Sequence, residues 1–133
     1  MELLVNKSKK WLAAAAIVAV LAGCARTAPV KNVETVVATG HSVSQVHDAI
    51  LKAGLVREWA MTDVSPGVIK GRLQARDHTA EIRIVYSATS YSINYESSIN
   101  LMAANGKIHK NYNRWVHNLD NAIKLNLASS GRA

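Results

Sequence analysis

The residues of this 133-residue chain that could do chemistry are chiefly five histidines and nine carboxylates. Such side chains bind metals or transfer protons when spacing or folding brings them together. No HExxH or comparable ligand spacing links the histidines, which lie on different predicted elements: His41, His47, His78, His109 and His117. We therefore predict neither a metal site nor a cofactor. The chain also lacks GxSxG, Walker and Rossmann glycine motifs, so we predict that it is not an enzyme.

The single cysteine, Cys24, ends an N-terminal segment that has three parts. A basic region comes first, residues 11–22 are uninterrupted apolar sequence, and small residues precede the cysteine. This order is typical of a secretory signal. The apolar run is shorter than the roughly 20 residues that a membrane-spanning helix needs. We therefore expect a cleaved signal and not a permanent transmembrane anchor.

The sequence Leu21-Ala22-Gly23-Cys24 resembles the lipobox of bacterial lipoproteins. The resemblance implies that the Cys24 thiol carries a diacylglyceryl group and that signal peptidase II cleaves between Gly23 and Cys24. Two acyl chains hold a protein on a membrane stably, whereas one binds only marginally. The alternative is an ordinary signal peptide followed by a free cysteine. Because Ala25 and not Asp follows the cysteine, the resemblance favours the outer membrane, with the domain facing the periplasm, over the inner membrane.

The length of the chain suits one small domain after the signal. We expect a signal peptide at 1–23, a lipidated tether at 24–32 and a single domain at 33–133. Removing the signal leaves 13 basic and 8 acidic residues, a formal charge of +5, because the signal contains Glu2, Lys7, Lys9 and Lys10. This charge suits an anionic envelope component or an envelope protein complex as the partner. A mildly basic solvated surface explains it equally well. Export argues against nucleic acid.

Hydrophobic periodicity predicts an α+β fold. A helix is expected over residues 40–54, where Ser42 and Gln45 form a capping box and Gly54 supplies a left-handed C-terminal stop. A longer helix is expected over 108–127. The strand-like runs are 33–38, 57–64, 68–76, 79–87 and 91–97, and short links require antiparallel hairpins. We predict two layers, a four- or five-stranded antiparallel meander with both helices packed on one face.

Alternation along the three central strands separates an apolar face from a charged face. Two-residue turns at 77–78 and 88–89 predict two apolar rows across these strands, Leu73-Ile82-Tyr95 and Gly71-Ile84-Ile93. Gly71 is expected to leave room for a helix. On the other face the same register sets Arg72 diagonal to Glu81, and Arg83 diagonal to Glu96. These four residues are the candidate binding surface. The alternative is a solvated face with ordinary ion pairs, each worth about 1 kcal/mol or less.

Two features remain open in the sequence. A two-residue turn at Pro66-Gly67 places Trp59 on the charged face, whereas a longer loop or a bulge turns it inward. We favour the core, because a buried Trp contributes more than an exposed one. The second feature is a polar cluster near the start of the last helix. It is expected either to bond to the sheet edge or the preceding loop, or to be solvated (His109, Asn113, Arg114 and Asn118).

The sequence of residues 108–119, IHKNYNRWVHNL, and the sequence of residues 95–101, YESSINL, resemble small, mostly uncharacterised proteobacterial lipoproteins. The resemblance implies the same fold and export route, and it implies no activity. We therefore expect a membrane-anchored periplasmic lipoprotein that acts as a non-enzymatic binding or accessory module of the cell envelope. The alternative is a small-ligand carrier or sensor with a cavity between the helices and the sheet.

Overall fold

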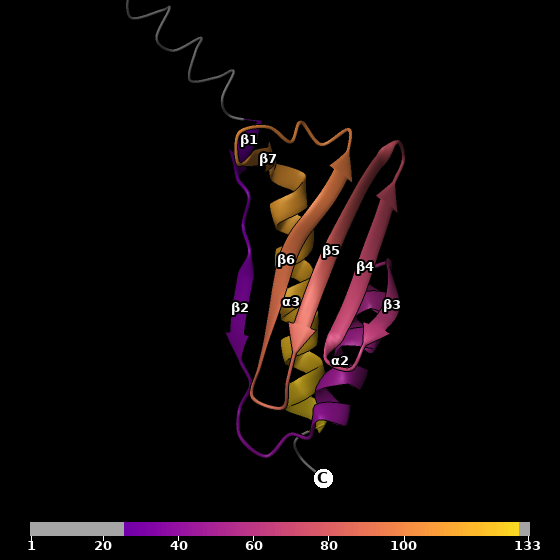
Figure 1. The fold of residues 1–133 in the computed structure, drawn as a ribbon, viewed down its shortest axis with the longest axis vertical. Helices are drawn as coiled ribbons and strands as arrows, with labels where there is room; N and C mark the ends of the chain where they lie inside the picture. The colour runs from indigo at the N-terminus through magenta and orange to yellow at the C-terminus, as the bar shows by residue number, and fades with distance from the viewer. Residues whose placement is uncertain (1–25, 131–133) are drawn as a thin grey trace, which may run out of the picture.

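The computed structural model of the chain describes residues 26–130. Five strands form one antiparallel sheet in the order β2-β6-β5-β4-β3. Both helices, α2 (Val43–Val56) and α3 (Lys110–Ser130), lie on the same face of this sheet (Figure 1). The predicted α+β fold is confirmed. The strands of the sheet are β2 (Val33–Val36), β3 (Trp59–Ser65), β4 (Val68–Ala75), β5 (His78–Tyr86) and β6 (Ser90–Ile99).

A second, two-stranded sheet joins the start of the described chain to the start of α3. Strand β1 (Thr27–Pro29) pairs antiparallel with β7 (Lys107–His109). The pairing is extended by hydrogen bonds from the Val30 amide to the Gly106 carbonyl and from the Lys110 amide to the Arg26 carbonyl, 2.8 and 3.1 Å long. Residues 27–29 of the segment predicted as a lipidated tether, 24–32, therefore form a strand. The last helix begins at Lys110 and not at 108, because residues 107–109 belong to β7.

The predicted register is correct for one central hairpin and wrong for the other. Ile82 pairs with Tyr95 and Ile84 with Ile93, as expected across β5 and β6. Across β4 and β5, however, Ile82 pairs with Gly71, two residues from the predicted partner. The turn consists of Arg76 and Asp77, one residue earlier than predicted, and Arg76 adopts a left-handed conformation (φ 58°) in it. Because the shift is an even number of residues, every side chain keeps its predicted face.

Trp59 lies in the core, as favoured from the sequence. It pairs with Leu73 and is 3% exposed. The turn between β3 and β4 does contain two residues, but the register shifts between Asp63 and Ser65. This irregularity adds one residue to β3 and so turns its earlier side chains inward.

The start of α2 agrees with its sequence signals, and its end does not. The Ser42 hydroxyl accepts from the Gln45 amide at 3.0 Å, and the Gln45 side chain accepts from the Ser42 amide at 2.8 Å, which completes the capping box. Gly54, in contrast, lies inside the helix and is buried. The left-handed residue after the helix is Glu58 (φ 65°). No helix in residues 26–130 is both long and apolar enough to cross a membrane.

Candidate functional site

The charged face of the sheet is the face that the helices leave open (Figure 1). The ion pairs on this face differ from those predicted. Lys70 Nζ lies 3.6 Å from a carboxylate oxygen of Glu81 and 3.6 Å from one of Glu96. Lys70, which was not included in the candidate surface, is thus the cation shared by both glutamates. The two-residue shift between β4 and β5 sets Lys70 diagonal to Glu81, whereas Arg72 lies directly opposite Glu81 and forms no ion pair with it.

Arg72 and Arg83 are both exposed and form no ion pair with any residue in 26–130. The Ser97 hydroxyl donates to Glu81 at 2.7 Å and is the main cause that lowers the pKa of this carboxyl. Lys70 and Arg72 lower the pKa of Glu81 further by their charge. Glu81 is therefore a fixed anion that suits a structural contact, and the two arginines are left available to an external anion.

We expect Arg83→Ala to change the free energy of unfolding by less than about 0.5 kcal/mol, because the side chain is exposed and unpaired. Urea unfolding of both proteins measures the difference. A loss of several kcal/mol would show that Arg83 belongs to a stabilising network.

A buried carboxylate that the sequence analysis missed lies on the opposite side of the sheet. Asp120 on α3 is 6% exposed. It accepts hydrogen bonds from the Thr35 hydroxyl on β2 at 2.9 Å and from the Tyr91 hydroxyl on β6 at 2.5 Å, and it pairs with Lys124 at 3.1 Å. Burial and the bond to Asp120 raise the pKa of Tyr91. The signal in the sequence was a carboxylate between Leu119 and Ile123, inside the apolar stripe of the helix.

The network borders a polar hollow of about 330 Å³ between β2 and α3, with Lys31, Glu34, His117 and Lys124 in its lining. Asn113 closes one side of it. The Asn113 side chain donates to the Pro29 carbonyl at 3.0 Å and accepts from the Lys31 amide at 3.1 Å. Asn113 thus bonds to the end of β1 and to the segment between β1 and β2, whereas Arg114 of the same polar cluster is exposed.

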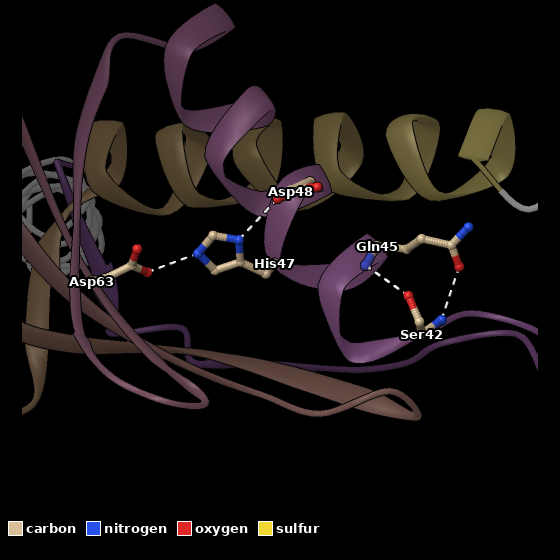
Figure 2. A network of polar contacts seen from close by, with 5 residues as sticks. All are labelled: Ser42, Gln45, His47, Asp48 and Asp63. Atoms are coloured by element: carbon tan, nitrogen blue, oxygen red, sulfur yellow. Dashed lines mark hydrogen bonds and ion pairs between the residues drawn. The ribbon is translucent and has the colours of Figure 1, made fainter.

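Figure 2 shows a histidine held between two carboxylates. His47 on α2 places Nδ1 3.0 Å from Asp48 and Nε2 2.9 Å from Asp63 on β3. The ring also lies 5.8 Å from the ring of Tyr86. The bond to Asp48 is the main cause that raises the pKa of His47, and Asp63 adds to it. No hydroxyl or thiol in the described part of the chain bonds to His47, so the arrangement clamps α2 to β3.

His41 makes a second clamp of the same chemical kind. Its Nδ1 lies 2.7 Å from the Ala38 carbonyl oxygen and its Nε2 lies 2.8 Å from the Leu127 carbonyl oxygen. Both nitrogens can donate only when the ring is protonated. These two carbonyl groups raise the pKa of His41, that of Ala38 most. The protonated ring connects the loop before α2 to the last turns of α3.

The two clamps predict a pH dependence of stability. A folded-state pKa above the unfolded value of about 6.5 gives stability that is fully present below pH 6.5 and is lost as the pH rises through the folded pKa. We expect the urea midpoint to fall between pH 6 and pH 8.5. The fall should be smaller in His41→Gln and in His47→Gln, and smallest in the double variant. A midpoint that rises over this range would contradict the assignment.

Residues 26–130 contain no group of three His, Cys, Asp or Glu side chains that could hold a metal ion. The space between the sheet and the helices is filled by fully buried side chains, among them Ile50, Ile82 and Ile123. A hollow of about 580 Å³ lies elsewhere, at the surface between α2 and the end of α3. This packing gives the ligand-carrier alternative no support.

Gly23, Cys24 and Ala25, on which the lipobox and sorting predictions rest, lie outside the described residues. Comparison with protein-family models and with curated proteins finds no match for this chain.

Proposed function

We propose that this protein is a lipid-anchored, non-enzymatic binding module of the bacterial cell envelope. The open face of its sheet would bind an acidic partner through Arg72 and Arg83. The observation that carries the proposal is that both arginines are exposed and free of ion pairs within residues 26–130, because both glutamates beside them form their ion pairs with Lys70.

The chemistry of the arginines defines the partner. A guanidinium group binds a carboxylate through two parallel hydrogen bonds, which gives both direction and strength. Arg72 and Arg83 lie on adjacent strands whose positions are fixed by the sheet. An acidic segment of an envelope protein fits such a pair. The side chains that could support catalysis are already engaged. His41, His47 and Asp120 form contacts that hold elements of the domain together.

Site-specific crosslinking in cells tests the binding face. A photoreactive residue would replace Gln74, which lies on the open face, and in a separate strain Asn121, an exposed residue of α3. We expect a discrete crosslinked protein from position 74 only. Replacing both Arg72 and Arg83 by Ala should abolish it, whereas replacing the exposed Lys52 and Arg57 by Ala should not. Equal crosslinking from position 121, or a product that survives loss of the arginines, would refute this face.

The anchor proposal places the protein in the outer membrane through Cys24, facing the periplasm. We expect Cys24→Ser to leave the precursor uncut and without lipid, because the thiol is the acylated group in the resemblance. Metabolic labelling with a fatty acid and the mass of the purified protein measure both effects. Normal cleavage of Cys24→Ser would refute the anchor.

A further inference from the structure

One end of the molecule is rich in exposed basic residues. The end that carries β1 and β7 also carries the turn between β4 and β5 and the loop after β6 (Figure 1). We call it the attachment end, and it exposes four basic residues and one acidic residue: Arg26, Arg76, Lys107, Lys110 and Asp77. The loops toward the opposite end, residues 37–42, 66–67 and 87–89, contain no Lys, Arg, Asp or Glu.

Hydrogen bonds join the parts of the attachment end into one surface. The Asn100 side chain donates to the carboxylate of Asp77 at 3.1 Å, and His78 bonds to the Asn100 carbonyl at 2.7 Å. The His109 amide donates to the Leu101 carbonyl at 2.8 Å. The turn at 76–77, the loop at 100–106 and the two-stranded sheet therefore hold fixed positions relative to one another.

The loop after β6 at this end also exposes an apolar side chain. Leu101 is buried and fixes the loop, whereas Met102 beside it is 56% exposed. Met102 also adopts a left-handed backbone conformation (φ 57°), which is costly for a bulky residue and clusters at functional sites. Every residue from 102 to 107 is exposed. Basic residues around an exposed apolar side chain are typical of a surface that meets a membrane interface.

The start of the described chain lies at the same end. Arg26 bonds to the first residue of α3, and only Ala25 separates it from Cys24. Two extended residues span roughly 7 Å, less than one Debye length at physiological salt. A lipid on Cys24 would thus hold the attachment end against the headgroups.

We propose that the attachment end rests on an anionic phospholipid surface, with the four basic residues at the headgroups and Met102 at the interface. This inference rests on the proposed lipidation of Cys24. It points the long axis of the sheet away from the membrane, directs the Arg72 and Arg83 face sideways, and holds the loops at 37–42, 66–67 and 87–89 farthest from the bilayer.

The single cysteine allows a test that does not need native lipidation. Residues 24–133 contain every described element, and their one thiol can be coupled to a maleimide lipid in vesicles of phosphatidylcholine with or without phosphatidylglycerol. Acetylation of lysines, read by mass spectrometry, reports exposure. We expect labelling of Lys107 and Lys110 to slow about fivefold on the anionic vesicles, the factor that one basic residue contributes near such a surface. Labelling of Lys52 on α2 should not change.

Charge-reversal variants provide the second arm. Replacing Arg76, Lys107 and Lys110 by Glu should leave the attachment end unprotected, as read by hydrogen exchange of residues 100–107. The control change of Lys52 and Arg57 to Glu should preserve the protection. Three results would overturn the orientation: equal protection on neutral and anionic vesicles, no protection on either kind of vesicle, or protection of Lys52. If Cys24 carries no lipid in cells, the anchor proposal is refuted. The vesicle experiment still measures whether the attachment end binds an anionic surface.

Discussion

Asp120→Ala should lower the free energy of unfolding by about 3 kcal/mol, the largest single loss that we expect from a polar side chain of this domain. The substitution leaves the buried Tyr91 hydroxyl with only the backbone carbonyl of residue 120 as acceptor, at 3.4 Å, and frees the Thr35 hydroxyl on β2. It removes one carboxylate that joins the edge strand, the sheet and α3. Urea unfolding monitored by tryptophan fluorescence measures the loss.

Two variants separate the parts of this network. Asp120→Asn keeps an acceptor oxygen of the same shape, so we expect it to lose about 1 kcal/mol. Lys124→Ala removes only the partner that is 53% exposed, and we expect a change below about 1 kcal/mol. If Asp120→Ala cost no more than Lys124→Ala, the buried hydrogen bonds would not be the stabilising part.

Gly54→Ala should destabilise the protein by about 2 kcal/mol, although the same change inside a helix is usually favourable by about 1 kcal/mol. A Cβ at position 54 would lie 2.4 Å from Met61 Cγ and 3.3 Å from the Trp59 carbonyl oxygen. Met61 fills the space between α2 and the sheet at this point, so the helix must move or the methionine must leave its place. Thermal unfolding of the purified variant measures the effect.

A double-mutant cycle tests the cause. Met61→Ala removes the side chain that the new Cβ meets first, so Gly54→Ala should become neutral or slightly stabilising in that background. An equal loss in both backgrounds would show that the backbone of α2, and not contact with Met61, demands the glycine.

The sequence predicted the layers of this fold because its periodicities are strong. Alternation in the three central strands placed Ile82, Ile84 and Ile93 in the core, and all three are fully buried. Glycine was harder to interpret. Gly54 was predicted to end a helix, and Gly71 was predicted to leave room for a helix on the sheet. Gly54 instead makes room for Met61, and Gly71 makes room for Ile82 and Met61, whose Cγ1 and sulfur lie 2.9 and 3.1 Å from where a Cβ of Gly71 would be. Such packing depends on three elements at once and has no local signal.

The candidate surface was predicted in its location and not in its pairings. Which face is charged depends only on whether a residue number is odd or even, but which charges meet depends on the register. Arg76 enters the turn in a left-handed conformation. The turn at residues 76–77 sets the register of β4 and β5, in which Lys70 lies 3.6 Å from both Glu81 and Glu96. Asp120 was missed for a different reason. Helical spacing marks it as a core position, but only the fold brings Tyr91 and Thr35 to it.

The pairing of β1 with β7 also has a mechanical consequence. In a chain held at Cys24, any pull on the domain would load this three-residue strand pair first, because it lies between the anchor and the rest of the structure. The large sheet and α3 lie beyond it and carry the load only after the pair opens. Peeling residues 27–32 would then release roughly 20 Å of extended chain while the core stays folded. The short sheet would open before the rest of the domain does, and its opening would lengthen the tether between the domain and the membrane.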